Sequence, residues 1–301
     1  MIENNEKSMR RRHLDFVRIE RIGQGRVQLS MKCDEEGKKM KWIACQKRRR
    51  RDPLELSIQI KKAFVDFYRI AATGARVDVP NFMEQQTQPA ERGSSTELPT
   101  ILVDRLREVF RGSEVDRLRL NEMELSDEAL HQIGSCLRST NCRVRLLSLE
   151  LTSLSSVSPS ALLQFVRDVA PTDLVFRMLR GCTEQHFGPE MCRFIVSRRF
   201  FSVSELIDAQ GNDILLSLDD SLLSELSAST FQIAVPSSIT VDGLRSFLKA
   251  FASGKRSLEN ASIKTSFPLR ERFPPTANAK IFIEDEKTIN IYSQAALQAV
   301  C

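Results

Sequence analysis

The sequence predicts an α/β fold in which short strand–helix units stack into a solenoid, with parallel inner strands and outer helices. The first observation is a strand-like motif, Val115-x-x-Leu118-x-Leu120. The second is that the middle residue of this motif returns at steps of 29, 27, 27, 30 and 30 residues. The positions concerned are Leu118, Leu147, Leu174, Phe201, Phe231 and Ala261. A near-constant step of this size is typical of repeat architectures.

A helical pattern follows most of these strands. Leu130, Ile133 and Leu137 are spaced by three and four residues and therefore share one helix face. Further stripes begin at Leu162, Met191, Leu222 and Leu244. Units this short cannot bury their apolar faces alone, but stacked units share a core between a sheet and a row of helices. We therefore predict an irregular leucine-rich-repeat-like solenoid over residues 100–265. The alternative is a compact α/β domain whose even spacing is a coincidence.

Ahead of the repeats, residues 15–75 predict a small antiparallel β-meander followed by a helix. Apolar and polar residues alternate in three runs, 16–22, 26–33 and 40–47, and a glycine-containing turn joins the first two. A proline at 53 precedes a helical stripe from 54 to about 72. Residues 1–14 form a polar lead, expected to be disordered. Residues 76–99 are rich in Gln, Pro and Ser without apolar periodicity, and we expect a mobile loop there.

After the repeats, residues 266–301 predict a closing hairpin and a tail. Three prolines between 266 and 276 exclude a continuing helix, and residues 280–284 and 288–292 alternate on either side of a polar turn. Such a hairpin would cover the last edge of the sheet. Within the repeats, Ser126 and Thr240 predict helix caps and Pro189 a first helical position. We expect the most regular units at 115–170 and the least regular at 196–230.

Composition sets the broad class. The chain is 42% hydrophobic and 28% charged, and it contains no run of 18 apolar residues, so no membrane span is expected. The polar start of the chain lacks the apolar segment of a secretory signal. Its seven scattered cysteines form no Cys-x-x-Cys pair, which favours reduced thiols in the cytoplasm or nucleus.

Motifs of catalysis are missing from the sequence. It contains no Walker A loop, no G-x-S-x-G and no H-E-x-x-H. His186 lies between Cys182 and Cys192, but this spacing matches no standard zinc site. A loop histidine and two structural thiols explain the three residues more simply. We expect no enzyme, no metal and no cofactor.

The predicted solenoid offers a partner-binding surface. Strand residues that alternate with the core face away from the helices. They are Arg117, Arg119, Asn121, Ser148, Glu150, Arg177, Ser202, Ser204 and Gln232, with Val175, Ala234, Asn260, Ser262 and Lys264 at the remaining positions. A mostly neutral surface with a basic end suits a protein partner that carries acid at that end. The alternative is that these are ordinary solvent-facing positions.

Two basic runs suggest a different class of function. They cover residues 10–12 and the patch Lys47, Arg48, Arg49, Arg50 and Arg51. These cations could neutralise phosphates, so a nucleic-acid-associated protein is the alternative function. No aromatic residue lies between positions 44 and 63, however, so stacking platforms for bases are missing there. A solvated turn or a nuclear-import signal would account for the same run.

Taken in order, these segments resemble a known family. The meander FVRIERIGQGRVQLSM, the helix DPLELSIQIKKAFVDFYRI and the unit VDRLRLNEMELSDEALHQIG together look like the C-terminal region of nematode F-box-associated proteins. The likeness in layout covers residues 15–292. It implies a role in substrate recognition for ubiquitin ligation, in which an F-box grips a Skp-type adaptor and the repeats hold the target. An F-box begins with Leu-Pro and continues through apolar helices, and residues 1–14 contain no such segment.

Overall fold

The computed structural model describes residues 12–22, 26–32, 39–45, 98–255, 258–269 and 279–293. All of them belong to one compact unit formed by residues 1–46 and 96–301. The helix predicted at 54–72, the basic patch at 47–51 and most of the loop predicted at 76–99 lie outside the described residues. The same holds for the first eleven residues of the polar lead.

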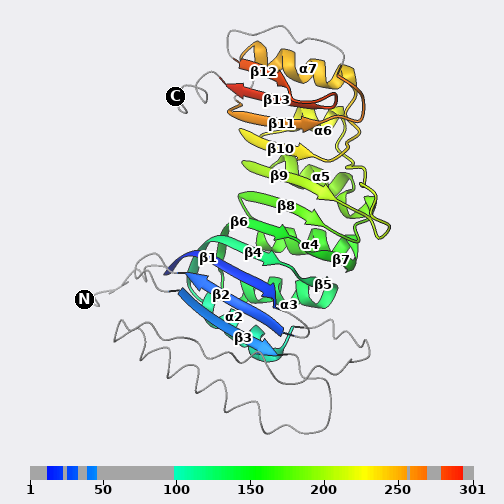
Figure 1. The fold of residues 1–301 in the computed structure, drawn as a ribbon. Coiled ribbons are helices and arrows are strands. Elements are labelled where there is room, and N and C mark those ends of the chain that lie inside the picture. Colours follow the sequence, from blue (N-terminus) through cyan, green and yellow to red (C-terminus); the bar gives the residue numbers. More distant parts are fainter. Residues whose placement is uncertain are drawn as a thin grey trace, which may run out of the picture. The chain divides into compact units, whose positions relative to one another are not determined.

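The described residues form a mixed α/β fold with one large, mostly parallel sheet (Figure 1). Its parallel strands are β1 (Arg12–Arg21), β4 (Ser113–Asn121), β6 (Arg143–Glu150), β8 (Asp173–Leu179), β9 (Phe200–Leu206), β10 (Thr230–Ala234) and β11 (Asn260–Lys264). At one end β2 (Arg26–Lys32) and β3 (Lys39–Cys45) continue the sheet, and at the other end β13 (Thr288–Ser293) and β12 (Ala279–Ile283) do so. The order is β12-β13-β11-β10-β9-β8-β6-β4-β1-β2-β3, so the sheet is open.

Helices cover one face of this sheet (Figure 1). They are α2 (Thr100–Phe110), α3 (Asp127–Ser139), α4 (Pro159–Val169), α5 (Pro189–Val196), α6 (Asp220–Glu225) and α7 (Val241–Ala252), with a short 3₁₀ turn, η2 (Glu184–Phe187). The predicted apolar stripes are buried against the sheet, and strand and helix side chains form one continuous core. None of these helices is both long and apolar enough to cross a membrane.

The register of the parallel strands agrees with the predicted ladder. Leu118 lies opposite Leu147, and Leu147 lies opposite Leu174. The next pairs are Leu174 with Phe201, Phe201 with Phe231, and Phe231 with Ala261. A slip of one residue would have moved each of these side chains to the opposite face of the sheet. The steps of 27–30 residues along the chain therefore predicted the strand pairing correctly.

The N-terminal meander is joined to the repeats. The antiparallel pairs β1–β2 and β2–β3 agree with the predicted meander. Because β1 also pairs in parallel with β4, with Val17 opposite Leu118, the meander is part of the same sheet instead of a separate leading element. The reason is visible in the sequence, since Leu14-x-x-Val17-x-Ile19 has the apolar spacing of Val115-x-x-Leu118-x-Leu120.

Local signals for helix starts and for the closing hairpin are also confirmed. The Ser126 and Thr240 side chains accept backbone hydrogen bonds at the N-termini of α3 and α7, and Pro189 begins α5. Strands β12 and β13 form the predicted antiparallel hairpin, and β13 pairs with β11. A two-stranded sheet of β5 (Glu124–Ser126) and β7 (Ser153–Ser156) was not predicted, because strands this short carry no clear alternation.

Candidate functional site

The sheet face opposite the helices, here called the sheet face, carries the predicted partner-binding residues in lateral rows. Each of these residues lies directly opposite a residue of the neighbouring strand, so the residues form rows across the sheet. The middle row is Arg18, Arg119, Ser148, Val175, Ser202, Gln232 and Ser262. On one side of it lie Glu20, Asn121, Glu150, Arg177, Ser204 and Ala234. On the other lie Phe16, Arg117, Leu146, Asp173, Phe200, Thr230 and Asn260.

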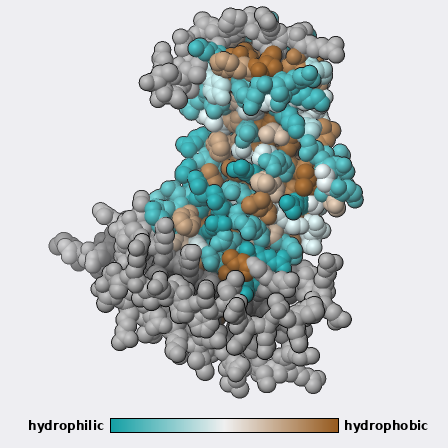
Figure 2. Space-filling view, viewed as in Figure 1, coloured by the Kyte–Doolittle hydropathy of each residue, from teal (hydrophilic) through white to brown (hydrophobic). Residues whose placement is uncertain are grey.

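Exposure varies among the predicted residues. Figure 2 is viewed onto the sheet face and shows a largely hydrophilic surface with small groups of hydrophobic residues. Arg117, Arg177, Gln232 and Asn260 are exposed. The remaining predicted residues are half-buried or buried, and the buried ones are Asn121, Ser148 and Ser204. These three therefore offer little surface to a partner.

Arginine side chains gather on the first strands of the sheet face. Arg18 of β1 and Arg119 of β4 lie directly opposite each other. Like charges placed opposite each other on neighbouring strands destabilise a sheet unless they are compensated. Arg18 Nη2 lies 2.5 Å from Glu20 Oε2, and Arg119 Nη2 lies 3.3 Å from Glu150 Oε1. Each arginine therefore has its own carboxylate.

Polar neighbours hold the two carboxylates in place. Gln28 Nε2 donates to Glu20 Oε1 at 2.7 Å, and Ser148 Oγ donates to Glu150 Oε1 at 2.5 Å. The Arg18 and Arg119 side chains are only 33% and 30% exposed, and the Nε of each is buried without a hydrogen-bond partner. The result is a pre-positioned pair of half-buried ion pairs across β1, β4 and β6.

Arg117 differs from these two arginines. It lies two residues before Arg119, on the same face of β4, and it is exposed. Its lateral neighbours are Phe16 of β1 and Leu146 of β6, both apolar. Within the described parts of the chain no carboxylate lies within ion-pair distance of its guanidinium. Arg117 is therefore a cation between two apolar side chains, without a local counter-charge.

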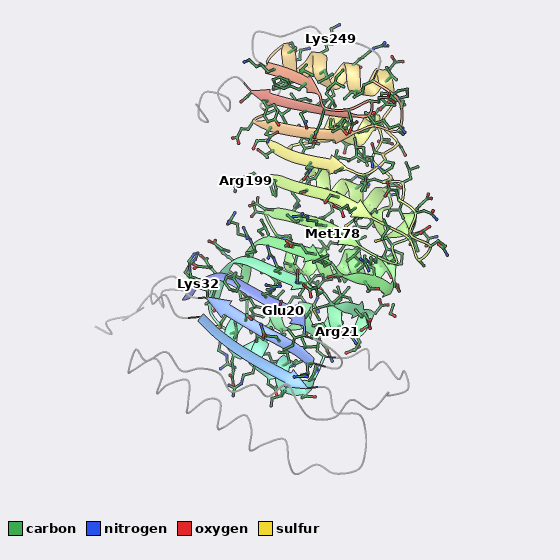
Figure 3. The ribbon with its side chains drawn as sticks, in the orientation of Figure 1. Glu20, Arg21, Lys32, Met178, Arg199 and Lys249 are labelled. Carbon is green, nitrogen blue, oxygen red and sulfur yellow. The ribbon has the colours of Figure 1, made fainter. Side chains whose placement is uncertain are left out.

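A chain of ion pairs runs along the edge where the parallel strands begin. Arg145 Nε lies 3.3 Å from Asp116 Oδ1, and Arg145 Nη1 lies 2.8 Å from Asp173 Oδ2. The same Asp173 oxygen lies 3.4 Å from Arg199 Nη2. Arg199 and Lys32 lie at this edge, and Glu20 and Arg21 lie at the opposite one (Figure 3). The Asp173 side chain is only 3% exposed, so Arg145 and Arg199 compensate a buried charge, and removal of both would leave that charge unpaired.

Sequence reasoning missed Arg18 and Glu20. The signal was present, because Leu14-Asp15-Phe16-Val17-Arg18-Ile19 repeats the apolar spacing, the aspartate and the second basic position of the segment from Val115 to Leu120. The signal was hidden because Val17 and Leu118 are separated by a step of 101 residues, far longer than the repeat steps of 27–30 residues. The ion-pair chain of Asp116, Arg145, Asp173 and Arg199 also follows the repeat step, but its residues do not lie at the ladder positions.

The histidine and cysteines considered for a metal or for catalysis are engaged in the fold. His186 Nδ1 accepts from the Thr183 backbone N–H at 2.9 Å, and its Nε2 lies 2.8 Å from the Val157 carbonyl oxygen. Burial raises the pKa of the Cys182 and Cys192 thiols to about 12, so both are thiols at neutral pH. No group of His, Cys, Asp or Glu side chains among the described residues has the arrangement of a metal site. The basic patch at 47–51, the basis of the nucleic-acid alternative, lies outside the described residues.

Searches against protein-family models and against curated proteins find no match for this chain.

Proposed function

We propose that the chain is a non-enzymatic protein-interaction module that binds its partner on the sheet face. In this proposal the repeats form an irregular leucine-rich-repeat-like solenoid, and the partner is another protein in the cytoplasm or nucleus. The observation that carries the proposal is the lateral alignment of polar residues on neighbouring strands, from Arg18 to Ser262. An extended row of mostly polar, partly exposed side chains, backed by a continuous core, suits a surface that binds an extended partner.

The buried groups support a structural role for the chemically reactive residues. His186 is held by two hydrogen bonds, and the Cys182 and Cys192 thiols have raised pKa values. A nucleophile needs the opposite, a lowered pKa and access to solvent.

The resemblance to nematode F-box-associated proteins extends the proposal to substrate recognition in ubiquitin ligation. In that case the sheet face would hold the target protein, and a Skp-type adaptor would be recruited through an F-box. Copurification of the full chain with a purified Skp-type adaptor would support this extension. Its failure would leave the interaction module standing without the ligase role.

Site-specific photo-crosslinking tests the proposed function. A benzoylphenylalanine at Gln232, on the sheet face, is expected to crosslink one defined protein, whereas the same group at Lys249 of α7 is not. Gln232 is exposed in the middle row, and Lys249 is exposed on a helix (Figure 3). Equal crosslinking from both positions, or crosslinking from Lys249 alone, would reject the sheet face as the binding surface. Recovery of RNA or DNA in place of protein would favour the nucleic-acid alternative.

A further inference from the structure

The charge distribution on β1, β4 and β6 points to the chemistry of the partner. Arg18 and Arg119 already have carboxylate partners, Glu20 and Glu150. Their remaining capacity to bind an anion is therefore small. Among the sheet-face arginines of β1 and β4, Arg117 alone is exposed and has no such partner within the described chain, so on these strands it is the cation open to an incoming anion.

The surroundings of Arg117 restrict the anion further. Phe16 and Leu146 lie opposite it on the two neighbouring strands, and neighbouring strands are separated by about 4.8 Å. A guanidinium presents a planar fork that matches a carboxylate with two parallel hydrogen bonds. Leu146 is buried and Phe16 is half-buried, so Phe16 provides most of the apolar surface beside Arg117, and this surface suits a ligand that carries apolar groups beside its charge.

A long polyanion fits this face less well. Glu20 and Glu150 lie on the same face, four residues farther along the strands than the row of Arg117. Nucleic-acid binding draws on several phosphate contacts, and Arg18 and Arg119 already have carboxylate partners, so β1 and β4 offer few such contacts. One carboxylate set between apolar residues needs Arg117 alone.

We propose that Arg117 binds the carboxylate of an aspartate or glutamate that a partner protein presents between apolar residues. Arg18 and Arg119 are each paired with a glutamate and do not bind the anion in this proposal. This inference rests on the proposed function, since it names the chemistry of a partner on the same sheet face.

Peptide selection tests the inference even while the partner is unidentified. A phage library of random heptapeptides is panned on the full chain, on Arg117→Glu and on Arg193→Glu. Arg193 is an exposed arginine of α5 on the helix-covered side, so its reversal makes the same change of net charge elsewhere. The native chain and Arg193→Glu are expected to enrich peptides with one acidic residue between apolar residues. Arg117→Glu is expected no longer to select these peptides. It should instead select peptides with a basic residue at the position of the acidic one.

Fluorescence polarisation with one enriched peptide measures how much each substitution weakens peptide binding. Arg117→Glu is expected to weaken its binding at least tenfold, and the glutamine analogue of the peptide is expected to lose a similar factor on the native chain. Arg117→Lys keeps the charge but loses the planar fork, so an intermediate loss is expected. Circular dichroism checks that each variant is folded. We expect folding to be retained, because Arg117 is exposed.

Three results would overturn the inference. They are enrichment of the same acidic peptides by Arg117→Glu, the absence of any acidic enrichment on the native chain, and displacement of the peptide by a twelve-nucleotide oligouridylate. A protein crosslinked from Gln232 together with any of these results would leave the proposed function intact and reject only the role of Arg117.

Discussion

The units between residues 113 and 170 and those between 200 and 252 have the same register but different packing. The first region has strands of nine and eight residues, helices of thirteen and eleven residues, and the added β5–β7 pair. The second has strands of seven and five residues, and its helix α6 has only six residues. Within 196–230, expected to be the least regular part, α6 is the shortest of the described α-helices, whereas α7 after it has twelve residues.

The two regions also fill their cores differently. Leucines occupy the ladder positions in the first region, whereas Phe201 and Phe231 occupy them in the second. The rings of Phe201 and Phe231 are stacked with their centroids 5.3 Å apart, and Phe231 meets Phe247 of α7 edge-on at 6.1 Å. Where the strands are shorter, larger side chains bridge the sheet and the helix layer, although α7 has twelve residues. The repeat thus preserves the strand register and the layer order, not one residue type.

Replacement of Phe231 by alanine should cause the largest loss of stability. Phe231 contacts aromatic rings on both the neighbouring strand and α7, so its removal should lower the free energy of unfolding by about 3–5 kcal/mol. Leu147→Ala in the first region should cost about 2–5 kcal/mol. Urea unfolding followed by circular dichroism measures both. Leu215→Ala is the control, because Leu215 is 40% exposed and its loss should change stability by less than about 0.5 kcal/mol. A cost for Phe231→Ala as small as that of the control would contradict the aromatic packing.

A shared helix-capping contact should give a smaller effect that is equal in both regions. The Asp127 carboxylate accepts from the Ser158 backbone N–H at 2.6 Å, and the Asp220 carboxylate accepts from the Thr240 backbone N–H at 2.8 Å. In each case the first residue of one helix holds the N-cap residue of the next. Asp127→Ala and Asp220→Ala should each lower the free energy of unfolding by about 1 kcal/mol, as loss of a helix cap does. Thermal unfolding measures the two losses.

Gly243 provides a control for the second of these contacts. A Cβ at this position would lie 1.8 Å from Asp220 Oδ1, so Gly243→Ala should be destabilising while Asp220 is present. In the Asp220→Ala background the same change should be neutral or stabilising, because alanine favours a helix over glycine. An identical effect in both backgrounds would show that Asp220 does not occupy the observed position.

The ends of the strands allow a change that should be stabilising. Four residues near the ends of β4, β6, β8 and β9 adopt left-handed backbone angles: φ is 53° at Glu122, 53° at Leu151, 54° at Met178 and 52° at Glu205. Each lies two residues after a buried strand residue, namely Leu120, Leu149, Phe176 and Val203. Strands β10 and β11 have no such residue at this position. Leu151 is 41% exposed, so Leu151→Gly should relieve backbone strain at little packing cost and raise the free energy of unfolding by about 0.5–1 kcal/mol. Leu151→Ala retains the strain and is the matched control. Equal stability of the two variants in chemical unfolding would argue against strain at this position.

The closing hairpin should respond locally to acid. A hydrogen bond from the Lys287 backbone N–H, with a second from the Thr288 hydroxyl, lowers the pKa of the Asp285 carboxyl below its ordinary value. A carboxylate with a lowered folded-state pKa stabilises the turn above its unfolded pKa of about 3.9, and this contribution is lost as the pH falls through the lowered value. The Lys287 amide resonance, followed by NMR from pH 6 to pH 2, should therefore move with a midpoint below that of a free aspartate. Asp285→Asn should abolish the movement, and a midpoint above the free value would contradict the assigned contact.

The sequence predicted much of the fold because its strongest signals are local or strictly repeated. Apolar spacing identified the parallel strands from β4 to β11, and the constant step set their register. The parallel pairing of β1 with β4 was not predicted, because a long segment separates Val17 from Leu118 and interrupts the step. For the sheet face, alternation predicted which side Arg117, Arg119 and Gln232 occupy. It could not predict that Ser148 is buried or that Glu150 pairs with Arg119, because these depend on side-chain lengths on neighbouring strands.

Cross-strand disulfide formation tests the central claim most directly, namely that these strands lie parallel and in register with the sheet-face residues aligned. Ser202 and Gln232 lie opposite each other on β9 and β10, with Ser202 Oγ 2.9 Å from Gln232 Oε1. Residues directly opposite on neighbouring strands fall within disulfide range, whereas residues offset by two positions are farther apart. Ser202→Cys/Gln232→Cys should therefore crosslink rapidly on mild oxidation, and Ser202→Cys/Ala234→Cys should crosslink slowly. Mass spectrometry of proteolytic fragments separates these crosslinks from those of the native cysteines. Faster crosslinking of the 202/234 pair would contradict the register and, with it, the rows of the sheet face.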